Sequence, residues 1–459
     1  MREVSLFCSW ILFITGIGLS VTAILMRSKE YSLSDRLSVS FGFGLGAVSL
    51  QMGILSFFGV PFTRSNLIMW SWPVVVPGVI MCRAGKGSCR KDPLESSGTT
   101  RFSFFEKFFI AGIGFEIFYA FFRALIRPME SYDSVAIYAL KAKIFFLSRS
   151  IPTGLLRDPL AIVPHADYPL LVPLSETSLY VFLGSLNDHL VKIIFPLFFV
   201  SLVVFVYLMV RRVVPRKESL LFTFLLASIP QVSAYATNGY ADLPFAFYYS
   251  LALFFLWRWM DGTRADSLAL SFFSLLLAAW TKNEGQMLAL IALFVSLWYL
   301  VRERKALRGR ETVSCAMYCV AALLLLLFAF VFPRSLGLVN DTVNAATLRP
   351  VAFVTQLTRL PDILYEYQIQ FFGPKKWNII WILCITGIIA GRARVFSGPL
   401  QYVSLSILFA LAGYTAVYLI TPQGLSWHLS TSASRLFIHF VPAAVYWLAC
   451  LCHDAGMDL

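Results

Sequence analysis

The chain has 459 residues, of which 58% are hydrophobic and only 14% are charged, and its mean hydropathy is +0.73. A soluble core of this size could not bury so much apolar surface, so the composition excludes a soluble globular protein and indicates a polytopic membrane protein. The net charge of +13 comes from Lys and Arg in short clusters between apolar runs, without a basic stripe carrying stacking aromatics, so we do not expect nucleic acid as a partner.

The first apolar run, residues 4–26, is too long for the core of a signal peptide and lacks a small-residue cleavage site, so it is expected to remain as a membrane span. The eight cysteines lie in apolar runs or in segments expected inside the cell. Neither a disulfide framework nor a cysteine-rich metal site is therefore predicted.

A helix needs about 20 apolar residues to cross roughly 30 Å of hydrocarbon. The sequence accordingly predicts an all-α polytopic membrane protein with about 13 transmembrane helices. The predicted spans lie at residues 4–26, 37–60, 66–82, 105–126, 189–210, 219–236, 241–260, 266–281, 285–301, 312–333, 376–390, 399–420 and 435–452.

Residues 168–186 form a further apolar run that hydropathy alone would count as a crossing. The basic clusters at 83–91, 211–217, 302–310 and 391–394 can all be cytoplasmic only if an even number of spans separates each pair. A crossing at 168–186 would place the second cluster on the wrong side, so we expect an interfacial or re-entrant helix there.

The same parity places the N-terminus outside, the C-terminus inside and the main polar segments on the outer face. Those segments are residues 127–188, 237–240, 282–284, 334–375 and 421–434. Residues 127–173 form the longest early interruption of the apolar sequence, which we interpret as an active-site loop. Within it, helical spacing of apolar residues predicts an amphipathic surface helix over Ser134–Phe146, and the second long loop has a similar run at Val351–Phe372.

Three carboxylates stand at positions suited to chemistry. Asp133 directly precedes the expected surface helix, where it could be a general base or an ordinary N-cap. Asp167 precedes Tyr168-Pro169, and Asp242 lies at the outer mouth of a span, where an ionisable group is costly unless it has a partner or a function. Carboxylates converging on one outer pocket could activate a hydroxyl or hold a divalent cation.

Two basic positions could bind a phosphate. Lys282 and Glu284 form a tight polar turn between two apolar runs, for which a solvated turn with a snorkelling lysine is equally admissible. Arg435 follows a segment rich in Ser and Thr that also contains His428; an N-cap followed by a snorkelling arginine is the alternative. Glu116, within a predicted span, is either a functional or a hydrogen-bonded structural carboxyl.

Taken together, these motifs resemble the GT-C membrane glycosyltransferases, the superfamily of the protein O-mannosyltransferases and the aminoarabinose and related lipid-linked sugar transferases. The resemblance covers roughly residues 105–452 and depends on SYDSVAIYALKAK, HADYPLL, TNGYADLP, WTKNEG and LSWHLSTSASRL, in that order. It implies two domains: residues 1–104 with three additional helices, and a GT-C-like catalytic core at 105–459 whose two outer loops are 127–188 and 334–375.

The resemblance also implies a polyprenyl-phosphate sugar donor, a lipid, glycan or protein acceptor, and a bacterial inner membrane with the active site facing the periplasm. Asp133 matches the position of the base, and Asp167 and Asp242 match later acids; Ser134 stands where the family often has a second acid. We expect the donor or its phosphate to be bound by Lys282, Arg435, Arg157, His165, Glu284 and His428. No cofactor is assigned beyond a possible divalent cation.

Two other functions fit a polytopic protein with this charge distribution. A lipid or polysaccharide transporter or flippase would need ionisable groups along a path through the membrane, for which Glu116 is the best candidate. A polysaccharide polymerase or ligase would share the lipid-linked substrate without needing Asp133 as a base.

Overall fold

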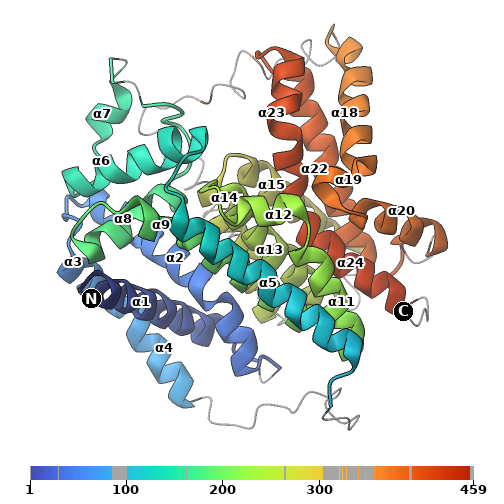
Figure 1. Cartoon of the computed structure of the whole chain (residues 1–459), viewed down its shortest axis with the longest axis horizontal. Coiled ribbons are helices and arrows are strands. Elements are labelled where there is room, and N and C mark those ends of the chain that lie inside the picture. The colour runs from blue at the N-terminus through green and yellow to red at the C-terminus, as the bar shows by residue number, and fades with distance from the viewer. Residues whose placement is uncertain are drawn as a thin grey trace. The chain divides into compact units, whose positions relative to one another are not determined.

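The computed structural model describes residues 2–28, 30–84, 101–158, 160–161, 163–262, 265–302, 355–391 and 395–454, together with residues 320, 323, 327, 340 and 347. This described part is all-helical and contains no strand (Figure 1). The predicted all-α class is therefore confirmed.

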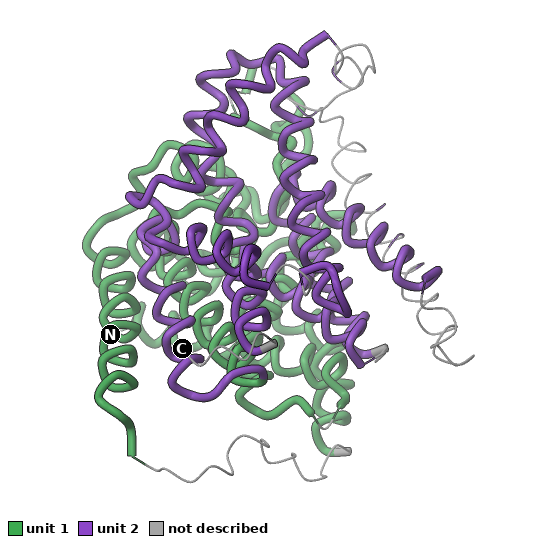
Figure 2. The backbone as a smooth tube through the Cα atoms, turned by 90° about the vertical axis from the view of Figure 1, so that its right-hand side faces the viewer, with its two compact units in different colours: residues 1–212, 234–244 green, residues 213–233, 245–459 purple. Residues whose placement is uncertain are grey.

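The helices group into two compact units, coloured green and purple in Figure 2. Unit 1 consists of Met1–Arg212 and Ala234–Pro244, and unit 2 consists of Val213–Ser233 and Phe245–Leu459. The predicted boundary after residue 104 divides an additional N-terminal segment from a family-like core. The two compact units are defined by contacts and not by family resemblance, so this boundary stays a prediction.

Unit 1 is built around α2, against which α1, α8 and α10 pack. The indole N–H of Trp10 on α1 donates a buried 2.9 Å hydrogen bond to Ser178 Oγ on α8, which fixes these two helices against each other. The helices of this unit are α1 (Arg2–Leu25), α2 (Leu33–Phe57), α3 (Arg64–Met69), α4 (Trp72–Ala84), α5 (Phe104–Ile126), the π-helix η2 (Ser134–Ala139), α6 (Leu140–Ser148), α7 (Thr153–Arg157), α8 (Leu171–Leu183), α9 (Asp188–Lys192) and α10 (Ile194–Val210).

The longest helices of unit 2 are α13, α15 and α22, and the others are shorter. Its helices are α11 (Arg216–Ala227), α13 (Asp242–Gly262, which begins in unit 1), α14 (Ala265–Thr281), α15 (Glu284–Arg302), the 3₁₀ turn η3 (Leu357–Arg359), α18 (Leu360–Phe372), α19 (Pro374–Trp377), α20 (Ile380–Ala390), α22 (Leu400–Ile420), α23 (Leu425–Ile438) and α24 (Val441–Asp454). The short helix α12 (Pro230–Tyr235) contains the boundary between the units.

Among the described residues, six helices are long and apolar enough to cross a membrane, and a seventh is formed if the bent pair α23–α24 is one span. The six are α1, α2, α5, α9–α10, α15 and α22, each at a predicted position. The predicted total of 13 is not confirmed. Three predicted spans correspond to shorter apolar helices, 66–82, 266–281 and 376–390, and the span at 312–333 lies almost wholly outside the described residues.

Two further predicted spans are not among these helices: one is interrupted, and the other is a single helix with polar residues near its ends. Residues 219–236 are interrupted at Ser228–Ile229, because Pro230 disfavours helical backbone in the residue before it, and form α11 and α12. The predicted span at 241–260 corresponds to one helix of 21 residues, α13 (Asp242–Gly262), but Asp242, Arg258 and Asp261 lower the hydropathy of its ends.

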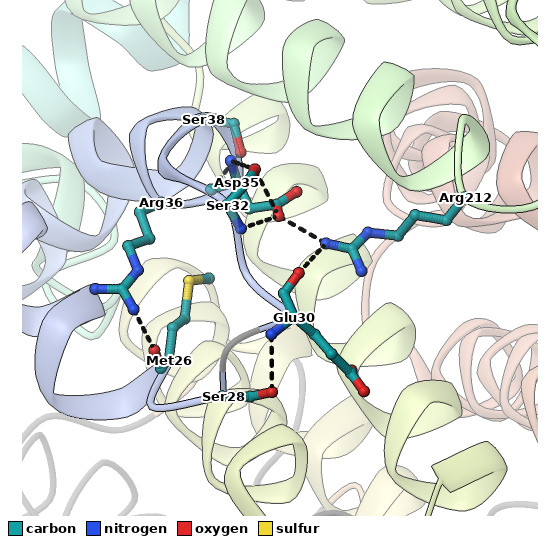
Figure 3. A network of polar contacts seen from close by, with 8 residues as sticks. All are labelled: Met26, Ser28, Glu30, Ser32, Asp35, Arg36, Ser38 and Arg212. Atoms are coloured by element: carbon teal, nitrogen blue, oxygen red, sulfur yellow. Dashed lines mark hydrogen bonds and ion pairs between the residues drawn. The ribbon is translucent and has the colours of Figure 1, made fainter. Parts of the chain in front are cut away.

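A polar network joins the α1–α2 turn to the end of α10 (Figure 3). The Asp35 carboxylate accepts hydrogen bonds from the Ser32 backbone N–H at 2.7 Å and from the Arg212 guanidinium at 2.6 Å, and it is almost fully buried. The same guanidinium donates to the Glu30 carbonyl at 3.3 Å. The α1–α2 turn and Arg212, near the start of the 211–217 basic cluster, thus lie at the same end of unit 1, as the even number of predicted spans between them requires.

Other hydrogen bonds join loops of unit 1 that are predicted to lie on the side opposite the α1–α2 turn. The Phe62 N–H donates to the Arg149 carbonyl at 2.7 Å, and the Ile151 N–H donates to Ser56 Oγ at 3.0 Å. The Asn187 amide donates to the Glu3 carboxylate at 3.3 Å. Even numbers of predicted spans separate these loops, so their contacts agree with the predicted arrangement. Which end of unit 1 faces the outside of a cell stays a prediction.

Helix α8 corresponds to the doubtful apolar run at 168–186. It has 13 residues, and all of them are buried. A helix lying at a membrane surface would expose one face, so the interfacial interpretation is wrong. At about 1.5 Å per residue, α8 is also too short to cross the bilayer, which agrees with a buried re-entrant helix.

Candidate functional site

Asp133 lies within a helical turn rather than ahead of one. Its backbone has φ −64° and ψ −36°, and its side chain makes no capping hydrogen bond to the π-helix that follows. The N-cap interpretation is therefore wrong. The predicted helix over 134–146 is present as η2 followed by α6, and Tyr138, Ala142 and Phe145 are buried in it, whereas Val135 is exposed.

The turn that leads to Asp242 packs directly against the start of this helix. Gly239 has φ +84°, and a Cβ there would lie 2.6 Å from Met129 Sδ and 2.7 Å from Ser134 Cβ. The motifs TNGYADLP and SYDS, about 100 residues apart, therefore adjoin in unit 1. Asp242 begins α13 and is fully buried, while Asp133 is half-buried.

Replacement of Gly239 by alanine should disturb this junction. The Cβ would force a rarely adopted backbone conformation and collide with Ser134, at a cost of about 1–3 kcal/mol. Thermal unfolding in detergent would measure the loss. Gly184→Ala is the matched control, because Gly184 has φ +74° with nothing within 4 Å of a Cβ; equal losses in both variants would mean that the junction with Ser134 contributes nothing.

Asp167 lies near a buried lysine on α6. Lys141 is fully buried, and its ammonium donates a hydrogen bond to the His165 carbonyl and lies 5.7 Å from the centroid of the Tyr168 ring. Burial lowers the pKa of Lys141 to about 7, although the negative charge of Asp167 opposes the change. Lys141 thereby holds the 165–168 turn, including Asp167, against the helix that begins near Asp133.

Two other predicted residues of unit 1 have different surroundings. His165 has φ +48°, and its ring packs on Tyr168 with centroids 4.6 Å apart, so its carbonyl is the group that contacts Lys141. Arg157 is in the last turn of α7 and is exposed. Asp133, Asp167 and Asp242 all belong to unit 1 together with these two residues.

In unit 2, the predicted Lys282–Glu284 turn is the centre of a buried polar cluster. The Lys282 ammonium lies 3.0 Å from the Glu284 carboxylate and 3.4 Å from His439 Nε2. On its other side, His439 Nδ1 lies 2.9 Å from the Tyr414 hydroxyl, and the Phe245 ring packs on the imidazole at 4.3 Å. The Lys282 side chain is only 5% exposed, so the interpretation of a solvated turn with a snorkelling lysine is wrong.

His439 lies at a bend between two apolar helices. Helices α23 and α24 meet at His439–Phe440 with a bend of 47°. Non-helical backbone at membrane depth is tolerated where protein buries it or where it lines a cavity, and such breaks form substrate sites in transporters. Tyr249 is fully buried, and its hydroxyl has no hydrogen-bond partner in the described part of the chain.

The remaining predicted residues, His428 and Arg435, lie on α23. His428 Nδ1 is 2.9 Å from Thr421 Oγ1, and its ring meets the Tyr418 ring edge-on at 5.0 Å. Arg435 is seven residues later, so both lie on one side of the helix, and its side chain is half-buried. The predicted hydroxyl-rich segment thus forms a helix in the same unit as the Lys282 cluster.

Glu176, in the centre of α8, is a buried acid that is not among the predicted site residues. Its carboxyl group is fully buried, and neither oxygen has a hydrogen-bond partner among the residues described. Burial raises its pKa, the charge of Asp188 raises it further, and that of Lys143 opposes the change. Lys143 and Asp188 form a half-exposed ion pair at 2.7 Å, and the Tyr180 hydroxyl donates to Asp188 at 3.0 Å.

The raised pKa predicts how stability depends on pH. Between the ordinary carboxyl pKa and the raised one, the folded protein binds more protons than the unfolded protein, so Glu176 destabilises the fold as pH rises. Glu176→Gln should match the wild type in melting temperature near pH 4.5 and exceed it increasingly toward pH 8. Glu130→Gln is the control, because Glu130 belongs to an exposed ion pair with Arg127. If the melting temperatures of the wild type and Glu176→Gln changed in parallel with pH, the raised pKa of Glu176 would be contradicted.

No group of three or more His, Cys, Asp or Glu that could hold a metal ion occurs among the described residues. Binding of a divalent cation stays a prediction. The sequence matches no protein-family model, and no curated protein matches it.

Proposed function

We propose that this protein is a membrane glycosyltransferase that moves a sugar from a polyprenyl-phosphate donor to a hydroxyl of a lipid, glycan or protein acceptor. The observation that supports this most is the packing of Gly239 on Ser134, because it brings the segment that leads to Asp242 against the segment that holds Asp133. Two carboxylate-bearing segments meet there, beside the helix whose Lys141 holds the Asp167 turn.

In the proposed reaction, the Asp133 carboxylate accepts the proton of the acceptor hydroxyl. The acceptor oxygen forms a bond to the anomeric carbon of the sugar as the bond from that carbon to the phosphate oxygen breaks. The lipid phosphate leaves with the electron pair of that bond, so cations need only stabilise its charge. Asp167 and Asp242 would position the base and the acceptor.

Cationic groups would bind the donor phosphate. Lys282 is suited to this role because it is buried and held in place by Glu284 and His439. Arg435, Arg157, His165 and His428 would provide further donor contacts. A GT-C-like bundle of about 13 helices, in a bacterial inner membrane with its acids facing the periplasm, is the architecture that accompanies this proposal.

The proposal is tested by incubating the purified full-length protein with a panel of polyprenyl-phosphate sugars and a membrane extract, and following donor and product by mass spectrometry. Consumption of one donor with formation of a glycosylated product is the expected result. If every donor is left intact with all acceptor classes supplied, the enzyme assignment fails. Uptake of lipid by reconstituted vesicles, abolished by Glu116→Gln, would then establish the transporter.

A further inference from the structure

Helix α5 is the most exposed of the candidate spans. Only 11% of its most apolar window is buried, against 33–72% for the other five. Its exposed face carries a row of aromatic rings. The rings of Phe115 and Tyr119 stack with their centroids 6.4 Å apart, and those of Phe118 and Phe122 with their centroids 5.8 Å apart. In a bilayer, this face would contact hydrocarbon chains along its whole length.

A cavity of about 390 Å³ lies at the C-terminal end of this exposed helix. Its lining residues recur at helical spacing along one face and are Tyr119, Phe122, Arg123, Ile126 and Arg127. Two arginines and two aromatic rings therefore share a hollow at the end of a hydrocarbon-facing span. Arg127 makes only an exposed 3.3 Å ion pair with Glu130, and the Arg123 guanidinium makes no ion pair within the described ranges.

The end of α5 also has an excess of positive charge. The Lys192 ammonium, on α9, donates to the Arg127 carbonyl at 3.0 Å and to the Pro128 carbonyl at 2.9 Å, so a cation covers the negative end of the helix dipole. The charges that act on Lys192 are those of Arg123, Arg127 and Glu130. Three cations thus face one carboxylate, which leaves the cavity positive.

We propose that this cavity binds the phosphate headgroup of an anionic glycerophospholipid whose acyl chains lie along the exposed face of α5. Arginine suits this task because its planar guanidinium binds two phosphate oxygens at once. The hollow is lined by α5 alone among the described residues, and none of the acids proposed for transfer lines it, so it would hold a bilayer lipid rather than a reacting donor. The inference does not depend on the proposed function.

The test is native mass spectrometry of the full-length protein in mild detergent, titrated separately with phosphatidylglycerol and phosphatidylcholine. The wild type should bind phosphatidylglycerol at least about tenfold more tightly than phosphatidylcholine. Because a charge-assisted hydrogen bond is lost with each arginine, Arg123→Ala/Arg127→Ala should lose about tenfold or more of that affinity. Arg123→Lys/Arg127→Lys should keep part of it.

Arg302→Ala is the matched control, since it removes one positive charge from the end of another candidate span, α15, outside this cavity. It should bind phosphatidylglycerol as the wild type does. Equal binding of both lipids by the wild type, or unchanged phosphatidylglycerol binding by the double alanine variant, would overturn the proposal. Displacement of phosphatidylglycerol by an equimolar polyprenyl phosphate would overturn the assignment to a glycerophospholipid. If the alanine variant does not fold, the lysine variant measures the same loss.

Discussion

Asp133→Asn is expected to reduce sugar transfer by about 10²–10⁴-fold, because a positioned general base contributes about that much to such reactions. Asparagine has nearly the same size and shape but cannot accept the proton of the acceptor hydroxyl. The Asp133 side chain makes no capping hydrogen bond, so the helix that follows does not need it in order to form. We therefore expect normal expression and a melting temperature within about 2 °C of the wild type.

The measurement is donor consumption and product formation by mass spectrometry, with the donor found for the wild type. Asp158→Asn is the matched control, because Asp158 lies in the same segment and its side chain accepts a local 2.9 Å hydrogen bond from the Leu160 N–H. Its rate should stay close to wild type. Full activity of Asp133→Asn would exclude Asp133 as the base, and an unfolded variant would indicate a structural role.

Lys282→Met should cause the largest loss of stability among these variants, together with loss of donor binding. Methionine has a similar length but no charge, so Glu284 would lose a cation held 3.0 Å away in a site where Lys282 is nearly fully buried. Removing one partner of a buried ion pair costs about 3–5 kcal/mol, and because the side chain of the remaining Glu284 is 30% exposed, we expect the lower end of that range, about 3 kcal/mol. A clear drop in melting temperature in detergent is the expected result.

A double variant separates the structural role of Lys282 from its role in binding. Lys282→Met/Glu284→Gln removes both charges, so it should recover most of the lost stability while donor binding remains weak. Thermal unfolding and donor titration of the three variants would show this. Donor affinity that returns with stability would mean that Lys282 supports the fold without touching the phosphate.

Hydropathy and charge parity predicted much of the helical framework, because both follow from the cost of placing polar groups in hydrocarbon. The exclusion of α8 as a crossing came from parity alone, and its 13 residues agree with that. The burial of α8 on every side could not be predicted, because it depends on packing against α1 and α2, which lie far earlier in the chain, and against α6.

The candidate site was predicted less completely for the same reason. Lys141 could have been found, since its position between Tyr138 and Phe145 places a lysine on the apolar side of the helix. The contact of Lys282 with His439 could not, because 157 residues separate them and only the break between α23 and α24 brings the imidazole there. The role of Glu176 could not be predicted either, because it rests on a fully buried carboxyl that has no hydrogen-bond partner among the described residues.

The ion pair between Asp35 and Arg212 constrains the order in which the chain can assemble during synthesis. Its partners are 177 residues apart, and Arg212 is the last residue of the long first segment of unit 1. The carboxylate is already oriented by its capping box at the start of α2, which is a local structure that α2 can form as soon as it has been made. The pair itself cannot form before ribosomal synthesis has passed residue 212. A nascent chain that stops short of this arginine would therefore carry an uncompensated carboxylate, and residue 212 marks the earliest length at which the insertion machinery could release this end of unit 1 in its final form.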